Sequence, residues 1–411
     1  MKMTTMDYVE EEPLSPLARV FQSPLIDTCI ITMIGFKSKI SPDVILDDLR
    51  LNVSKHPRFC SKLSDNGARW VKTEVIVEDH VHAPEIDPQE VNEDGQRFVD
   101  DYVSRLTMIP LDRSRPLWDI HILNVKTNDA EAVGVIRCHH ALADGMSLMC
   151  LLVACTRKSS DPEAFPSTLA IKRRGHFLPQ SLGNKSDLLR SIFAIHHALT
   201  LIWNTVVDLL HSWATVLFLK DTETPLKQGG RVENKLKRFY HRTISLDDIK
   251  LIKNAMNMTI NDVLLGVTQA ALSRYLNGRY GNADVESGAS TSDQNNLPGG
   301  IRLRAGVAVN LRKEIGIKVA AVLFKRLQSN TTTFFSNIAG PVEEVSLHGN
   351  HIAYIALSCY GNSQALWIHF ISYGKKMIIS MAVDPTVIPD PHNLCDEMEE
   401  ALKAIKDTLF L

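Results

Sequence analysis

Strand-like and helix-like segments alternate in two separate halves of this sequence, and that division limits the possible folds more than any single residue does. In the first half, β-branched residues predict strands over 25–37, 119–125 and 132–138, and a serine followed by proline predicts a helix over 41–53. The polar, proline-broken stretch 156–190 then separates this half from the rest. A chain of 411 residues exceeds one ordinary domain, so we expect two cores.

The second half repeats the mixture of strands and helices after a long apolar segment. Helical spacing is clearest over 261–275, and alternating or apolar runs predict strands over 352–358, 365–372 and 376–383 before a final amphipathic helix. We therefore predict an α/β (α+β) fold with mixed sheets in two lobes. The predicted division is an N-terminal lobe over 1–160, a linker with a long amphipathic helix over 161–238, and a C-terminal lobe over 239–411.

Composition excludes some functions and suggests a compartment. The formal net charge of -2 does not favour nucleic acid as a partner, because such binding usually needs a strong basic excess. The seven cysteines are dispersed without a C-x-x-C pair, which is typical of reduced thiols in a protein that faces the cytosol. The acidic N-terminus lacks the basic start and apolar run of a secretory signal.

The apolar segment 188–219 raises the question of membrane contact. Its polar residues recur every three or four positions and so form one stripe along a helix, and Asp208 would lie near the middle of a bilayer. Insertion of such a carboxylate costs about 2.5–3.5 kcal/mol, which argues against a simple span. A helix lying in the membrane interface fits the pattern. The alternative is a long core helix packed between the two lobes.

The candidate site follows the predicted strand 132–138 and precedes an apolar helix over 146–155. His139 and His140 lie at the strand end, and Asp144 and Gly145 lie at the turn into the helix. An alcohol is a poor nucleophile until a base removes its proton, and imidazole titrates in the range that suits this task. A carboxylate four residues later can fix the loop, and glycine lets a substrate approach the backbone.

Simpler interpretations of the same residues remain open at this stage. Adjacent histidines point to different sides of a strand, so at least one of them is expected to be structural. Asp144 could act only as a helix N-cap. A zinc signature such as His-Glu-x-x-His is absent, so no metal is expected. The run Gly145 to Met149 lacks the last glycine of a serine-hydrolase elbow.

Ordered sequence blocks make the assignment specific. The His-His-x-x-x-Asp-Gly run resembles the signature of the coenzyme A-dependent acyltransferase superfamily, which includes chloramphenicol acetyltransferases, carnitine acyltransferases and peptide-synthetase condensation domains. Five further blocks resemble the plant-type bifunctional wax ester synthase/diacylglycerol acyltransferase family, and together they span nearly the whole chain. These blocks are Pro13-Leu14-Ser15-Pro16 with Phe21-Gln22-Ser23-Pro24, Pro110 to Trp118, Asn261-Asp262-Val263-Leu264, Val309-Asn310-Leu311-Arg312, and Ser336 to Glu343.

The resemblance implies roles for individual residues. It implies that His140 is the general base, that His139 supports it structurally, and that Asp144 organises the loop by pairing with an arginine, for which Arg312 is our candidate. Gly145 completes this catalytic motif. Other matching positions are expected to bind substrate or hold the structure, namely Asn261, Asp262, Asn310, Arg312, Gly340 and Pro341. It also implies two chloramphenicol-acetyltransferase-like lobes with a tunnel between them, in which acyl-CoA and an alcohol meet.

The implied activity is direct acyl transfer, without an acyl-enzyme, a metal or a cofactor other than acyl-CoA as co-substrate. The implied acceptors are a long-chain alcohol, which gives a wax ester, and diacylglycerol, which gives triacylglycerol. Because such acceptors reside in membranes, an interfacial helix over 188–219 would help to collect them. The resemblance implies a location at the cytosolic face of the endoplasmic reticulum membrane, with the plasma membrane as an alternative.

The sequence departs from the family pattern after Arg312. The family has several dozen residues, including a Trp-Gly-Asn segment, between its Asn-Leu-Arg and Ser-Asn blocks, whereas here only residues 313–328 follow before Ser329-Asn330. The C-terminal lobe is therefore expected to be shortened, and loss of a strand would expose a sheet edge. A catalytically impaired lipid-binding or regulatory relative is one alternative. An enzyme with a soluble acceptor is another, although the Asp-Phe-Gly-Trp-Gly block of such plant acyltransferases is absent.

Overall fold

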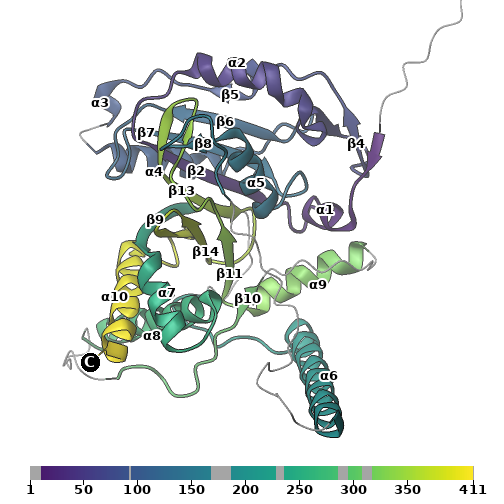
Figure 1. The fold of residues 1–411 in the computed structure, drawn as a ribbon, viewed down its shortest axis with the longest axis vertical. Coiled ribbons are helices and arrows are strands. Elements are labelled where there is room, and N and C mark those ends of the chain that lie inside the picture. Colours follow the sequence, from purple (N-terminus) through teal and green to yellow (C-terminus); the bar gives the residue numbers. More distant parts are fainter. Residues whose placement is uncertain are drawn as a thin grey trace, which may run out of the picture.

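The computed structural model describes residues 11–91, 94–167, 187–227, 236–285, 295–307 and 317–410 of the chain. Figure 1 shows one lobe built mainly from N-terminal elements, a second lobe built from C-terminal elements, and the long helix α6 (Asp187–Leu217) standing apart from both. The division into two α/β lobes agrees with the prediction.

The N-terminal lobe is built around a seven-stranded sheet with the order β5-β6-β7-β2-β13-β12-β8. All neighbouring strands are antiparallel except the β5–β6 pair, and a separate small sheet has the order β1-β4-β3. The elements in chain order are β1 (Glu11–Pro13), α1 (Pro16–Phe21), β2 (Cys29–Phe36), α2 (Pro42–Asn52), β3 (Ser61–Leu63), β4 (Arg69–Lys72), β5 (Val81–His82), α3 (Pro88–Val91), α4 (Gly95–Leu106), β6 (Trp118–Leu123), β7 (Ala132–His139), α5 (Gly145–Cys155) and β8 (Arg157–Lys158).

The C-terminal lobe is built around a five-stranded mixed sheet with the order β10-β11-β14-β15-β9. The strands β10, β11 and β14 are parallel to one another, and β14, β15 and β9 are antiparallel. The elements are β9 (Arg238–Ser245), α7 (Leu246–Ala255), α8 (Ile260–Val285), β10 (Ala305–Val307), α9 (Ile317–Asn330), β11 (Thr333–Ala339), β12 (Val345–Leu347), β13 (Asn350–Tyr360), β14 (Leu366–Tyr373), β15 (Lys376–Val383) and α10 (Pro391–Phe410).

Strand β13 joins the two lobes. It comes from the C-terminal part of the chain but lies beside β2 in the N-terminal sheet. Its side chains also contact β9 of the C-terminal sheet. Tyr354 stacks on His241 with ring centroids 4.1 Å apart, and Tyr360 meets Phe239 edge-on at 6.4 Å. The sheet of the first lobe therefore includes residues of the predicted range 239–411, and its face packs directly on the second lobe.

Helix α6 covers the predicted apolar segment almost to the residue. Its large apolar side chains are exposed, with Trp203 at 68% and Trp213 at 53% of their accessible surface. It touches the body of the protein near its C-terminal end, where the Asn330 side chain donates to the Thr215 carbonyl oxygen at 2.6 Å. The alternative of a core helix packed between the lobes is therefore wrong. Within the described ranges, none of the helices combines the length and apolar content that crossing a bilayer requires.

Local sequence signals account for the elements around the candidate site. Residues 132–138 form β7, and the apolar run 146–155 forms α5, which begins one residue earlier at Gly145. The side chain of Asp144 caps α5 by accepting a hydrogen bond from the Ser147 amide at 2.7 Å. The predicted helix over 41–53 is α2, although Ser41 makes no side-chain capping bond.

Candidate active site

The histidine pair lies at the turn between β7 and α5. His139 is the last residue of β7, and the His140 amide donates to the Thr28 carbonyl oxygen at 2.9 Å. The Leu142 amide donates to the His139 carbonyl oxygen, also at 2.9 Å, and closes a tight turn. These main-chain bonds fix both histidine side chains where the N-terminal sheet ends.

The imidazole of His140 is buried against an aromatic ring. Its ring stacks on Phe21 of α1 with centroids 3.9 Å apart and planes 15° from parallel. Burial lowers the pKa of His140 to about 4, with a smaller contribution from the neighbouring His139. Within the described residues, its buried Nδ1 has no hydrogen-bond partner. The ring is therefore neutral at physiological pH and able to accept a proton.

His139 has a structural environment. It is 3% exposed, its Nε2 lies 3.1 Å from Oδ1 of Asp27, and its Nδ1 accepts a hydrogen bond from the Ala141 amide. Asp27 also accepts a hydrogen bond from Arg113 at 2.9 Å. The contact with His139, aided by Arg113, lowers the pKa of Asp27. The Pro110–Trp118 block thus reaches the histidine pair through one carboxylate.

Asp144 and Gly145 shape the start of α5. Asp144 is exposed and forms the N-cap of α5. Within the described residues it makes no ion pair, so helix capping is the interaction that its carboxylate makes there. A Cβ atom at Gly145 would lie 2.8 Å from Cδ1 of Ile338 in β11 and 3.6 Å from the Leu357 side chain. Glycine at this position therefore allows α5 to approach the C-terminal lobe closely.

A second buried histidine lies close to His140 from the C-terminal side. His369 of β14 is 3% exposed, and its Nδ1 lies 3.3 Å from the hydroxyl of Ser358 in β13. Burial, together with a smaller effect of the nearby His140, lowers the pKa of His369 to about 3. The junction of the lobes therefore holds two neutral imidazoles, of which only His140 belongs to the predicted motif.

The structure also brings together the predicted blocks of the C-terminal lobe. The side-chain amide of Asn337 in β11 donates to the side-chain Oδ1 of Asn261 at 2.8 Å, which ties α8 to β11. Asp262 accepts bonds from the amide and hydroxyl of Thr259 at 2.8 and 2.7 Å, and Thr259 accepts in return, as in a capping box. Asp262 is therefore structural.

Gly340 and Pro341 follow β11 next to α5. A Cβ atom at Gly340 would lie 2.2 Å from the Ser372 carbonyl oxygen and 3.6 Å from the sulfur of Met149. The Pro341 carbonyl oxygen accepts from the Gly374 amide at 3.0 Å. The two predicted residues Asn310 and Arg312 lie outside the described residues, so the pairing of Asp144 with Arg312 and the tunnel between the lobes stay predictions.

One cluster away from the motif has the residue types of a metal site. Potential ligand atoms of His82, Asp119 and His121 lie within 4.8 Å of one another. The guanidinium of Arg137 already binds both oxygens of Asp119, with a distance of 2.9 Å from Nε to Oδ1. A permanent positive charge on this carboxylate disfavours a cation there, so the cluster is better explained as a buried ion-pair network.

The two lobes, with the histidine motif at a strand–helix turn where they meet, define a CoA-dependent acyltransferase fold. Comparison with family models gives the particular family. The "Wax ester synthase/diacylglycerol acyltransferase catalytic domain" matches residues 62–264, and the "WS/DGAT C-terminal domain" matches residues 303–406. The chain belongs to the wax ester synthase/diacylglycerol acyltransferase family and is an acyltransferase.

Relatives from Arabidopsis thaliana support this membership. Wax ester synthase/diacylglycerol acyltransferase 10 is 60% identical over 477 aligned positions, which cover 98% of this chain and 99% of the relative. Wax ester synthase/diacylglycerol acyltransferase 7 is 54% identical over 98% of this chain and 99% of its own length. Because 98% of a 411-residue chain fills only part of 477 positions, about 70 positions of the first alignment have no counterpart here.

Solved structures support the fold. The wax ester synthase/diacylglycerol acyltransferase from Marinobacter aquaeolei VT8 matches with a TM-score of 0.62 and 18% identity, covering 97% of this chain and all of the other. The first condensation domain of the calcium-dependent antibiotic synthetase matches with a TM-score of 0.55 and 12% identity, over 97% and 96% of the two chains. The chain therefore shares its fold with both of these structures. The match of both family models favours the enzyme over a catalytically impaired relative.

Sequence reasoning missed three residues that shape the site. Phe21 lies inside a recognised block, but nothing in that block indicates that its ring covers His140. Asp27 has a backbone φ of +34°, a conformation in which Asp is enriched, yet its partner His139 is 112 residues away. His369 lies in an apolar strand with no local signal. Each contact depends on how distant strands are arranged.

Proposed function

We propose that this chain transfers a long-chain acyl group from acyl-CoA to the hydroxyl of a long-chain alcohol or diacylglycerol, with His140 as the general base. The observation that supports this most is the neutral, mostly apolar setting of the His140 ring where the two lobes meet. The names of the relatives above support the choice of acceptors. A soluble acceptor, the remaining alternative, is not favoured by any of them.

The reaction needs one proton acceptor and no covalent enzyme intermediate. The His140 imidazole takes the hydroxyl proton as the oxygen attacks the thioester carbonyl carbon, and a tetrahedral intermediate forms. Collapse of this intermediate breaks the C–S bond and releases CoA thiolate, which the imidazolium reprotonates. The ester then carries the acyl group, and His140 is neutral again. Acyl-CoA is the co-substrate, and no step calls for a metal.

The neighbouring residues hold the base in position. Asp27 and Arg113 fix His139, and the main-chain turn after His139 fixes His140. Asp144 caps α5, so the helix that follows the base starts at a fixed place. The low pKa of His140 keeps its ring free of a proton before the alcohol arrives, because burial disfavours the imidazolium.

The test is turnover of labelled palmitoyl-CoA with hexadecanol or diacylglycerol by purified protein. His140→Ala should lower ester formation by about 10²–10⁴-fold, the usual contribution of a general base. His392→Ala is the matched control, because His392 is an exposed histidine on α10. Circular dichroism should show both variants folded. Unchanged turnover in folded His140→Ala would refute the proposed role.

We also propose that α6 lies in a membrane interface and brings the enzyme to its acceptors. The support is the exposed apolar face of α6, with tryptophans that favour the interface between lipid and water. Such a surface suits the cytosolic face of the endoplasmic reticulum membrane, where diacylglycerol and long-chain alcohols would be at hand, and it would equally suit the plasma membrane.

The membrane proposal is tested with vesicles of phosphatidylcholine that contain diacylglycerol. Replacing Trp203 and Trp213 by aspartate should abolish sedimentation of the protein with vesicles. The change removes two large aromatic side chains from the apolar face of α6 and puts two negative charges there. Replacing the adjacent exposed residues Asn204 and Ser212 by aspartate adds the same charges and should leave binding intact. Equal binding by both double variants, or no binding by the wild type, would contradict the proposal.

A further inference from the structure

A row of polar residues crosses the face of the C-terminal sheet that packs against β13. This polar row consists of cross-strand neighbours, namely Ser336 of β11, His369 of β14, Ser380 of β15 and His241 of β9. Residues that pair across neighbouring strands point to the same face of a sheet, so their side chains lie next to one another. The strands β14 and β15 are otherwise strongly apolar, and buried polar groups in such a setting need an explanation.

Apolar side chains surround the polar row. The cross-strand neighbours that flank it are buried core residues, namely Phe334, Trp367 and Ala382 on one side and Ile338, Ile371 and Ile378 on the other. Strand β13 covers the row, where Ser358 lies 3.3 Å from His369 and Tyr354 stacks on His241. Because side chains alternate along a strand, Ala356 faces the same way as these two β13 residues and offers no polar atom.

The middle of the polar row lacks a protein partner. The Ser380 side chain is completely buried, and no described residue forms a hydrogen bond with its hydroxyl group. An unsatisfied buried hydroxyl costs free energy, and such groups are usually satisfied by ordered water. A serine held between two imidazoles is therefore best explained by water molecules that bind along the row.

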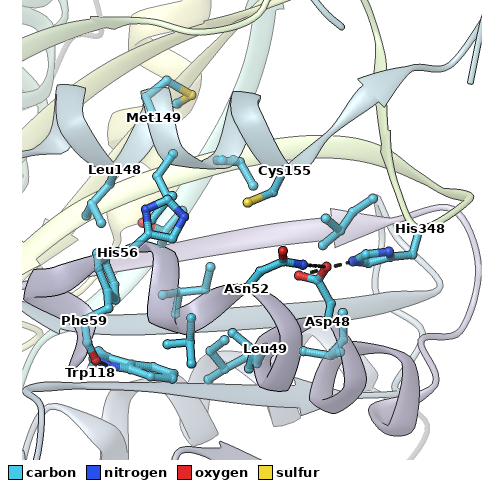
Figure 2. Close-up of a pocket in the computed structure, with 18 of the residues that line it drawn as sticks. Asp48, Leu49, Asn52, His56, Phe59, Trp118, Leu148, Met149, Cys155 and His348 are labelled. Atoms are coloured by element: carbon cyan, nitrogen blue, oxygen red, sulfur yellow. Dashed lines mark hydrogen bonds and ion pairs between the residues drawn. The ribbon is translucent and has the colours of Figure 1, made fainter. Parts of the chain in front are cut away.

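The N-terminal lobe offers water a poorer path. Figure 2 shows a pocket between α2, α5 and the sheet, and most of its lining side chains are apolar, among them Leu49, Leu148 and Trp118. Its volume is about 170 Å³, and apolar cavities of this size stay dry. Water is therefore expected to approach the base from the C-terminal side.

The polar row leads from the base to the protein surface. At one end, His369 lies so close to His140 that a charge on His140 disfavours protonation of His369. At the other end, Nε2 of His241 lies 3.4 Å from Oδ2 of Asp129, whose side chain is 59% exposed. Imidazoles can pass protons between water molecules, and an exposed carboxylate can pass them on to solvent.

We propose that this chain has a second activity, the hydrolysis of acyl-CoA to a free fatty acid and CoA, with water that reaches His140 along the polar row. The proposal rests on the acyl-transfer function above, because both reactions use the same base and the same acyl donor. They differ in the nucleophile. Water takes the place of the alcohol when no acceptor is bound.

The hydrolysis follows the same steps as ester formation. His140 removes a proton from water as the water oxygen attacks the thioester carbonyl carbon. The tetrahedral intermediate collapses, the C–S bond breaks, and the imidazolium protonates the CoA thiolate. The products are a carboxylic acid and CoA thiol, which contain all atoms of acyl-CoA and water. The acid ionises at neutral pH, so hydrolysis releases one net proton, which the row can carry to Asp129.

The experiment supplies purified full-length protein with palmitoyl-CoA below its micelle concentration and without an alcohol. CoA release is followed with a thiol reagent, and mass spectrometry identifies palmitate formed in water enriched in heavy oxygen. Wild type should release CoA and singly labelled palmitate in equal amounts, and His140→Ala should lose this activity together with ester formation.

The outcomes separate the two activities. Wild-type protein that forms hexadecyl ester but releases no palmitate would overturn the inference and leave the acyl-transfer proposal standing. Palmitate release that persists in His140→Ala would also overturn the inference, because it would not depend on the base. Wild-type protein that forms neither product would overturn both proposals.

Substitutions of Ser380 test the path. Ser380→Thr and Ser380→Val are equal in size and differ only in the hydroxyl group, so they form a matched pair. With hexadecanol present below saturation, the ratio of palmitate to hexadecyl ester should be about three- to tenfold lower in Ser380→Val, the effect of one hydrogen bond. If these variants fail to fold, Ser380→Ala is compared with wild type. An equal ratio with and without the hydroxyl would overturn the inference.

His241→Phe tests the surface end of the polar row. Phenylalanine keeps a ring that can stack on Tyr354 and removes the nitrogen that faces Asp129. The ratio of palmitate to ester should fall in this variant. His351→Phe is the matched control at an exposed histidine of β13, and its ratio should stay within about twofold of wild type. Equal ratios in folded His241→Phe and His351→Phe would overturn the inference.

Discussion

Phe21→Ala tests the idea that burial of the His140 ring sets its protonation. Phe21 covers one face of the imidazole at a centroid distance of 3.9 Å. Alanine at this position lets water reach the ring, and water stabilises the imidazolium relative to the neutral form. The pKa of His140 should therefore rise towards its ordinary value.

The magnitude follows from the present pKa. Burial lowers it from 6.5 to about 4, which corresponds to roughly 3 kcal/mol. Phe21 supplies one face of that burial, so its removal should recover roughly a third, or about one pH unit. Because only the neutral ring accepts a proton, activity is lost as pH falls through the pKa of His140. The acid limb of the activity profile should thus move upward in the variant.

The assay is kcat/KM for acyl-CoA between pH 4 and pH 8, with circular dichroism at each pH to confirm the fold. Phe21→Leu keeps an apolar side chain over the ring and should leave the acid limb near its wild-type position. An acid limb that does not move in folded Phe21→Ala would refute the reasoning. So would a wild-type limb that already lies near the ordinary histidine pKa.

Two predictions concern stability and can be read from thermal or urea unfolding. Gly340→Ala should destabilise the protein by about 1–3 kcal/mol, because the new methyl group would lie 2.2 Å from a main-chain oxygen of β14. Gly278→Ala lies in open space on α8 and should instead stabilise the protein by about 0.5–1 kcal/mol. Equal effects of the two would contradict the close approach. Arg137→Met should cost about 3–5 kcal/mol, since it leaves the buried carboxylate of Asp119 without its cation. Arg97→Met, in an exposed ion pair, should change stability by less than about 1 kcal/mol, and a comparable loss in both variants would refute the distinction.

Elements with strong local signals were predictable from the sequence. β7 is an apolar run that ends at the histidine pair, and α5 is an apolar run that begins after Asp144. The capping bond joins Asp144 to the amide of Ser147, only three residues later. Interactions over so few residues depend little on the rest of the chain. The strand, the turn and the helix that position His140 could therefore be placed in advance.

Long-range contacts could not be predicted in this way. β13 pairs with β2, more than 300 residues earlier, and no pattern inside either strand names its partner. The same applies to Asp27 beside His139 and to Phe21, whose ring stacks on His140. Helix α6 shows the same limit, because its sequence fits an interfacial helix and a core helix equally, and only its exposure in the folded chain excluded the core.

The sequence by itself determined the chemistry of this protein. It carried the blocks that resemble the acyl-transfer family and the strand, turn and helix around the histidine motif, and these local elements depend on residue types at short spacings. Only the tertiary structure decided the state of the His140 imidazole. Its pKa depends on how much water reaches the ring, and that is fixed by burial of the ring and by Phe21, which the fold brings against it from a distant part of the chain.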